Sequence, residues 1–150
     1  MRLARERTEI DRPVARVWPY IIRPENFQRW NTKISAMDAH GEFRLGQPFT
    51  THYRWNAREI QCVSIATEIQ EGRVLALRHT SPSGPGIKRD MEIVERITLE
   101  AAGGRTIVTK VVHVKHHGGP WILIPLIWFV TRFGRPTGPN PLKTMCEAEG

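Results

Sequence analysis

The chain has 150 residues, 40% of them hydrophobic and 25% charged, with a formal net charge of +7. These values are typical of one soluble globular domain, residues 1–150, that is large enough for a hydrophobic core. No apolar run reaches the roughly 18–20 residues that cross a bilayer, and residues 1–10 lack the apolar region of a secretory signal, so we expect a cytoplasmic protein.

A strand is predicted over residues 3–10, and two short helices follow it. Apolar residues there repeat with the spacing of a helix that lies on a core: Val14, Val17, Trp18, Ile21 and Ile22. Pro13 suits the first position of this helix, and Pro24 opens a second one that brings Trp30 to the same side. Pro19 lies inside the first helix and predicts a kink or a short 3₁₀ stretch.

The chain from residue 31 to residue 116 predicts one antiparallel sheet with many turns. The predicted strands cover residues 31–40, 48–55, 58–70, 73–80, 88–101 and 105–116. The segment SPSGPG (81–86) predicts a loop, and Gly103 and Gly104 predict a hairpin turn. In segment 48–55, alternation gives one face that is the better core candidate: Phe49, Thr51, Tyr53 and Trp55.

The sequence changes character after Gly118-Gly119-Pro120. Residues 121–133 (WILIPLIWFVTRF) are apolar on all sides, and as a helix they would span about 20 Å, too short for a bilayer core of about 30 Å. A helix that is apolar all round must be buried, and the concave face of a curved sheet offers the area. Pro125 predicts a kink, residues 134–141 predict an interruption, and residues 141–148 predict a short final helix.

The pattern I-x-R-P-V-x-x-V-W-x-Y-I-x-x-P-E-N-F-x-x-W at residues 10–30 resembles the N-terminal signature of the START-like (SRPBCC) superfamily. That group includes polyketide cyclases/dehydrases, lipid-transfer domains and birch-pollen-allergen-like proteins. The Gly103-Gly104 turn, Thr106 and PLKTMCE at 141–147 extend the resemblance over nearly the whole chain. Arg23 departs from it, since an acidic residue often stands there.

The resemblance implies an α+β helix-grip fold. In this fold one curved antiparallel sheet wraps around a C-terminal helix, two short helices follow the first strand, and the space between sheet and helix often holds an apolar ligand. In this chain the C-terminal helix is predicted to be kinked or broken, because prolines and glycines interrupt residues 118–141.

Glu95 and His79 are the candidate catalytic residues. Glu95 is predicted on the apolar face of its strand, where burial would raise the pKa of its carboxyl, as a general acid or base near neutral pH requires. His79 is predicted to point inward and could form an acid–base pair with Glu95 or orient a ligand hydroxyl. Alternatively, a bulge turns Glu95 outward, Arg78 or His79 pairs with it structurally, or His79 is a satisfied core histidine.

The candidate ligand-binding residues are aromatic: Trp30, Tyr53, Trp55, Trp128 and Phe129. Such side chains suit flat or ring-bearing ligands, although they also fill cores. We expect no metal site, because His113 and His116 would point to opposite faces of a strand, and His113 and His117 would lie roughly 13 Å apart. No cofactor-binding motif is present, and Cys62 and Cys146 predict reduced packing thiols.

Three functions remain open from the sequence. The first is binding of a hydrophobic or aromatic small molecule, lipid- or polyketide-like, in a cavity between the sheet and the C-terminal helix. The second is a polyketide cyclase/dehydrase-type enzyme that uses Glu95 and His79. The third is a membrane-surface or protein-interaction module, including a homodimer, that uses residues 121–133. Nucleic acid is not an expected partner, because Lys and Arg are scattered and no nucleic-acid-binding motif accompanies them.

Overall fold

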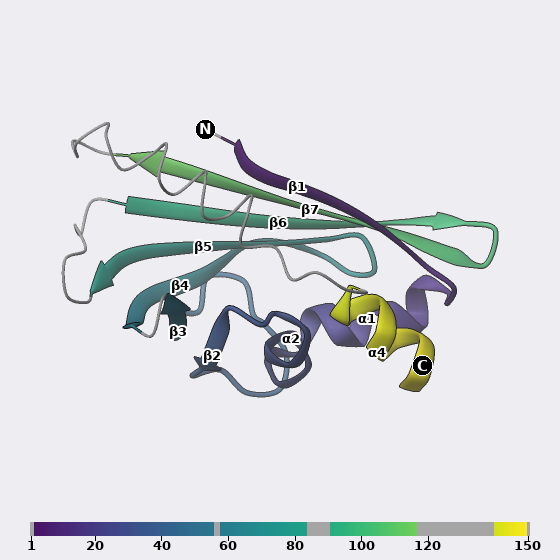
Figure 1. Cartoon of the computed structure of the whole chain (residues 1–150), viewed down its shortest axis with the longest axis horizontal. Coiled ribbons are helices and arrows are strands. Elements are labelled where there is room, and N and C mark those ends of the chain that lie inside the picture. Colours follow the sequence, from purple (N-terminus) through teal and green to yellow (C-terminus); the bar gives the residue numbers. More distant parts are fainter. Residues whose placement is uncertain (1, 56–57, 84–90, 117–139, 150) are drawn as a thin grey trace.

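The computed structural model describes residues 2–55, 58–83, 91–116 and 140–149. In this part of the chain one antiparallel sheet forms a layer, and short helices pack on one of its faces (Figure 1). The helices are α1 (Val14–Ile22), α2 (Pro24–Trp30) and α4 (Pro141–Glu149). The strands are β1 (Arg2–Ile10), β2 (Ile34–Met37), β3 (Phe49–Trp55), β4 (Arg58–Gln70), β5 (Val74–Ser83), β6 (Met91–Ala102) and β7 (Arg105–His116).

The strand order is β1-β7-β6-β5-β4-β3-β2, so β2 to β7 form a meander and β1 joins it beside β7. The β6–β7 hairpin turns at Gly103 and Gly104, whose φ values of 58° and 84° match a type I′ turn. We call the face of the sheet that the helices cover the inner face. The predicted curved antiparallel sheet and the two short helices after the first strand are confirmed.

The helices follow the predicted apolar spacing. On α1 the side chains of Val17, Trp18, Ile21 and Ile22 are buried. Pro24 begins α2 as predicted, whereas Pro13 precedes α1 as its N-cap instead of occupying the first helical position. Of the two effects predicted for Pro19, the 3₁₀ stretch is wrong, because α1 is continuous α-helix, and the kink stays a prediction. The helix tolerates Pro19 because the carbonyl of Ala15, which loses its N–H partner there, belongs to an exposed residue.

The predicted final helix is confirmed as α4, which is tied to β1 at its start. Asn140 Oδ1 accepts a hydrogen bond from the Leu142 N–H (3.0 Å), and Asn140 Nδ2 donates to Thr8 Oγ1 on β1 (2.9 Å). Lys143 Nζ donates to the carbonyl of Glu9 (2.7 Å). Leu142 and Cys146 are buried in the core, so α4 closes one end of the inner face. The predicted helix over 121–133 lies outside the described residues.

Two strand boundaries differ from the prediction. The predicted loop at 81–86 begins later, because β5 continues to Ser83, which pairs with Gln61 of β4. The strand predicted over 31–40 is limited to Ile34–Met37. The face of β3 predicted to be the core face does point inward, with Thr51 fully buried and Tyr53 half-buried.

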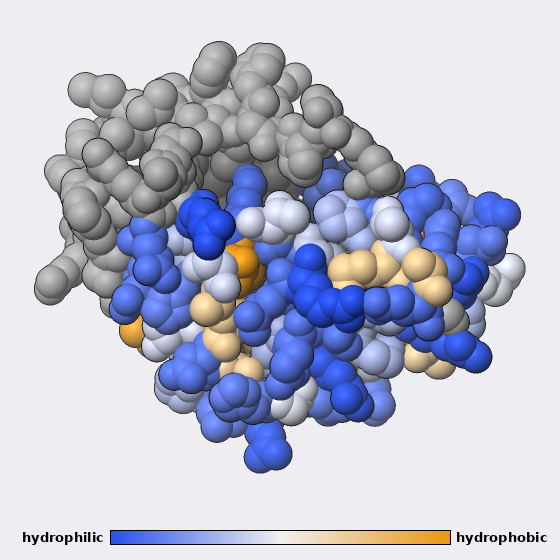
Figure 2. All heavy atoms as spheres, turned by 60° about the horizontal axis from the view of Figure 1, so that its bottom comes forward, coloured by the Kyte–Doolittle hydropathy of each residue, from blue (hydrophilic) through white to orange (hydrophobic). Residues whose placement is uncertain are grey.

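Among the described residues on the side of the molecule that carries the helices, hydrophilic ones dominate, and hydrophobic ones form small separate patches (Figure 2). None of the described helices is long and apolar enough to cross a membrane.

Candidate functional site

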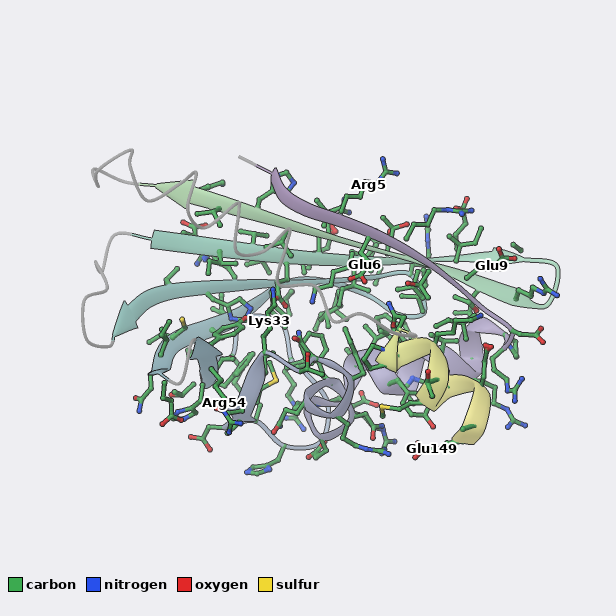
Figure 3. All side chains as sticks on the ribbon, in the orientation of Figure 1. Arg5, Glu6, Glu9, Lys33, Arg54 and Glu149 are labelled. Carbon is green, nitrogen blue, oxygen red and sulfur yellow. The ribbon has the colours of Figure 1, made fainter. Side chains whose placement is uncertain are left out.

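A row of polar side chains crosses the inner face of the sheet, one from each of six neighbouring strands. The strand register places Glu6 directly opposite Lys110, and Ser64 directly opposite His79. In sheet order the row is Glu6 on β1, Lys110 on β7, Glu95 on β6, His79 on β5, Ser64 on β4 and Thr51 on β3. Figure 3 shows Arg5 and Glu6 on opposite sides of β1, as strand alternation requires.

Hydroxyl groups hold the His79 ring in place from one side. Thr51 Oγ1 and Ser64 Oγ are 2.7 Å apart, and Ser64 Oγ is 2.6 Å from His79 Nδ1. Thr51 and Ser64 are fully buried, and His79 is 1% exposed. This chain of hydrogen bonds runs across three strands. It holds the imidazole with Nδ1 toward Ser64 and Nε2 on the opposite side of the ring.

Glu95 faces the other edge of the ring. Its Oε2 lies 3.8 Å from His79 Nε2, which is an ion-pair distance and too long for a hydrogen bond. Tyr53 Oη donates a hydrogen bond to Glu95 Oε1 (3.3 Å), and the Tyr53 ring meets the His79 ring edge-on with 5.4 Å between centroids. Among the described residues, neither Glu95 Oε2 nor His79 Nε2 has a hydrogen-bond partner, although both atoms are buried.

The pKa of the Glu95 carboxyl differs from the prediction. Burial raises the pKa of the Glu95 carboxyl, but Lys110, His79 and the Tyr53 hydroxyl together lower it to about 2. The predicted rise is therefore wrong, because the desolvation cost is outweighed by Lys110 and His79 on the two adjacent strands and by the Tyr53 hydroxyl, which reaches Glu95 from β3. Burial, and then the Glu95 charge, raise the pKa of Tyr53 well above its ordinary value.

Lys110 links this group to the helices. Its Nζ lies 5.4 Å from the centre of the Trp30 ring, a cation–π distance. The Trp30 ring is fixed in turn by a hydrogen bond from Nε1 to the carbonyl of Tyr20 (2.8 Å) and by an edge contact with Phe27. Trp30 is 8% exposed and packs in the core beside Lys110, and its ligand-binding role stays a prediction.

Apolar side chains lie beside the pair on the inner face. Ile60, Ile93 and Val112 point to the inner face beside Tyr53 and Glu95, and all three are half-buried. Figure 1 shows α1, α2 and α4 beneath one half of the sheet, while the Ser83 end of β5 and the Met91 end of β6 extend beyond them. The two unpartnered polar atoms therefore lie in an apolar part of the inner face.

The structure brings together three of the residues singled out from the sequence: Glu95, His79 and Tyr53. The proposed alternative partner Arg78 is exposed on the opposite face, so of the two, His79 is the one beside Glu95. The side chain of Trp55 and the residues Trp128 and Phe129 lie outside the described residues, and their ligand-binding role stays a prediction.

Sequence reasoning missed Lys110 and Ser64, and it placed Thr51 on the core face without assigning it to the site. The strand alternation of residues 105–116 places Lys110 on the face of Val108 and Val112, and this was the available signal. Within the described part of the chain, no group of three or more His, Cys, Asp or Glu residues could hold a metal ion. His113 is exposed, and the side chains of His116 and His117 lie outside the described residues.

A separate groove of about 440 Å³ lies between α1 and the turn at Glu71 and Gly72. Val14, Trp18 and Ile22 form its apolar wall, and Glu42 and Glu71 lie at its edge. None of the candidate catalytic or ligand-binding residues lines this groove.

Comparison with known proteins identifies the family and the fold. The family model described as "Polyketide cyclase / dehydrase and lipid transport" matches residues 1–133. A START superfamily protein from Mycobacterium smegmatis superposes with a TM-score of 0.69 at 10% identity, with 98% of each chain covered. Ara h 8.0201 gives a TM-score of 0.57 at 14% identity, covering 97% of this chain and 94% of that chain.

DynU16, a protein of the dynemicin biosynthetic locus, gives a TM-score of 0.61 at 16% identity over 96% of this chain and 46% of its own length. The comparison with curated proteins found no match. At these identities the solved structures show the fold alone, which is the predicted helix-grip fold. Because the family model covers most of the sequence, the chain belongs to the polyketide cyclase / dehydrase and lipid transport family.

Proposed function

We propose that the protein binds a largely apolar small molecule on the inner face of the sheet, beside His79 and Glu95. The observation that carries this function is the pair of buried polar atoms, Glu95 Oε2 and His79 Nε2, which have no hydrogen-bond partner among the described residues. Buried polar atoms are normally paired, so an unpaired pair facing half-buried apolar side chains is what a ligand site presents. The apolar side chains are those of Ile60, Ile93 and Val112.

Binding is favoured over acid–base catalysis by the charge state of Glu95. A carboxyl with a pKa of about 2 is ionised near neutral pH, so it has no proton to donate as a general acid. It is also a weak base, since a catalytic base works best with a pKa near the operating pH. We therefore assign Glu95 and His79 to ligand recognition, and the cyclase/dehydrase-type reaction is the second candidate.

The family supports an apolar ligand. Its description joins polyketide cyclases and dehydrases with lipid transport, and lipids are largely hydrocarbon. A role in membrane-surface contact or homodimer formation rests on residues 121–133, which lie outside the described residues, and it stays a prediction.

The proposed site can be tested by filling it. Ile93→Trp places a bulky ring on the inner face beside His79, whereas Val94→Trp adds the same ring on the outer face of the same strand. Isothermal titration calorimetry with 2-naphthol as the probe would measure affinity in both variants. We expect Ile93→Trp to weaken binding at least about tenfold and Val94→Trp to leave it unchanged.

Native mass spectrometry of protein purified from its own host provides an independent test. We expect a retained apolar molecule at near-stoichiometric ratio, which denaturing extraction would release for identification. Absence of a retained molecule together with no measurable 2-naphthol binding would overturn the proposed function.

A further inference from the structure

We propose that the ligand presents a hydroxyl group, as an alcohol or a phenol, which bridges His79 Nε2 and Glu95 Oε2. This inference rests on the proposed function and specifies the chemical class of the ligand. It is carried by the 3.8 Å gap between the two buried atoms and by the hydrogen bonds that fix the groups on either side.

The first step concerns which group donates at the gap. Glu95 Oε2 belongs to an ionised carboxylate, which only accepts hydrogen bonds. A neutral His79 with its proton on Nδ1 would turn the Nε2 lone pair toward this carboxylate, which is unfavourable. The favoured form has its proton on Nε2 and accepts the Ser64 hydroxyl at Nδ1, at the observed 2.6 Å. A protonated ring also carries an N–H at Nε2, so the gap has one donor and one acceptor in either case.

The second step concerns the size of the gap. Two atoms 3.8 Å apart are too distant to bond directly, but a single oxygen can reach both. For an oxygen about 2.8 Å from each atom, the Nε2–O–Oε2 angle would be roughly 85°. The lone-pair and O–H directions of one hydroxyl can accommodate this angle. The gap therefore matches one small atom that both donates and accepts.

The third step is the selection between functional groups. A hydroxyl donates to Glu95 Oε2 and accepts from His79 Nε2, so it satisfies both buried atoms at once. A ketone accepts but cannot donate, and leaves Oε2 unpaired. A carboxylate has the same defect and also places a second negative charge beside Glu95. A hydrocarbon satisfies neither atom, and leaving buried polar groups unpaired is costly.

The fourth step is the rigidity of the pair. Thr51 and Ser64 hold the ring on one side, and Tyr53 holds Glu95 Oε1 on the other, so neither group can turn far enough to close the gap without losing a hydrogen bond. Lys110, placed by the Trp30 ring, favours the charged form of Glu95. A site fixed before the ligand arrives discriminates between ligands more strongly than a mobile one.

A matched set of probes tests this selection on the unaltered protein. Naphthalene, 2-acetylnaphthalene, 2-naphthoate and 2-naphthol share one ring system and differ in the polar group. Isothermal titration calorimetry would give the four affinities. We expect 2-naphthol to bind at least about tenfold more tightly than each of the other three, since it alone makes both hydrogen bonds, one of them to a charged group.

Variants then assign the preference to the pair. In Glu95→Gln the side-chain amide can also donate a hydrogen bond. The ratio of the affinity for 2-naphthol to that for 2-acetylnaphthalene or 2-naphthoate should therefore fall by about tenfold or more. Glu100→Gln removes the same charge from the exposed outer face of the same strand and should leave the ranking unchanged. Long-range ¹H–¹⁵N spectra should show the His79 Nε2 signal shift with 2-naphthol but not with naphthalene.

The outcomes separate this inference from the proposed function. Tight binding of all four probes with equal affinity would overturn the hydroxyl selection and leave the apolar site standing, with a water in the gap. Binding of none of them would overturn the proposed function as well. A preference for 2-naphthol that Glu95→Gln leaves intact would also contradict the bridge.

Discussion

The charge on Glu95 predicts a defined pH dependence of stability. The pKa of this carboxyl is about 2 in the folded protein, against an ordinary value of 4.5. Because the folded value is the lower one, ionised Glu95 contributes stability above about pH 4.5, and this contribution is lost as the pH falls toward 2. The shift corresponds to about 3 kcal/mol in full, of which roughly half is lost by pH 3.5.

The assay compares the wild-type protein with Glu95→Gln in urea unfolding, followed by tryptophan fluorescence from pH 7 to pH 3.5. Carboxyls elsewhere in the chain titrate in both proteins and cancel in the difference. We expect the wild-type advantage to shrink over this range by roughly half of the full contribution of about 3 kcal/mol. Glu100→Gln is the matched control for loss of one negative charge from β6.

A constant difference between the wild-type protein and Glu95→Gln over this pH range would refute the reasoning. A difference that grows as the pH falls would mean that the pKa of Glu95 is raised, as expected from burial alone. In that case Lys110, His79 and Tyr53 do not outweigh desolvation, and the assignment of Glu95 as a fixed acceptor fails.

Three further predictions concern the core, the thiols and the hairpin turn. Leu77→Ala, at a fully buried position, should cost about 2–5 kcal/mol in urea unfolding, and a loss no greater than that of the half-exposed Val63→Ala would count against the described core. Burial raises the pKa of Cys62 to about 11 and that of Cys146 to about 12. Both thiols should therefore react with Ellman's reagent at pH 8 far more slowly in the folded protein than in urea. Rapid reaction of the folded protein would contradict this burial. Gly104→Ala should lower the free energy of unfolding by about 1–2 kcal/mol in thermal melts, because the φ of 84° is unfavourable for alanine; an unchanged melting temperature would exclude this turn geometry.

Local patterns predicted the elements well where one physical signal dominated. The apolar spacing from Val14 to Ile22 identified α1, and the glycine pair at 103–104 identified the hairpin, because both signals act within a few residues. The end of β5 was missed, because Ser83 is kept in the strand by pairing with Gln61, which is distant in sequence. A loop-like composition was outweighed there by a partner strand.

The sequence predicted which face of the sheet carries the candidate site residues, but it did not predict the pKa of Glu95 or the hydrogen bonds around His79. Strand alternation alone placed Glu95 and His79 on the inner face. The pKa of Glu95 depends on Lys110, which belongs to the next strand and approaches Glu95 only through the β6–β7 register. Ser64 and Thr51 were not assigned to the site for the same reason: a hydroxyl becomes part of a chain of hydrogen bonds only when the sheet brings the strands together.

The location of a bound ligand is the most direct test of the account. Intermolecular nuclear Overhauser effects between 2-naphthol and isotopically labelled protein would report which side chains touch the probe. We predict contacts to the methyl groups of Ile93 and Val112 and to the ring of Tyr53. Contacts confined to Val14 and Ile22, in the groove on α1, would contradict the proposed site on the inner face of the sheet.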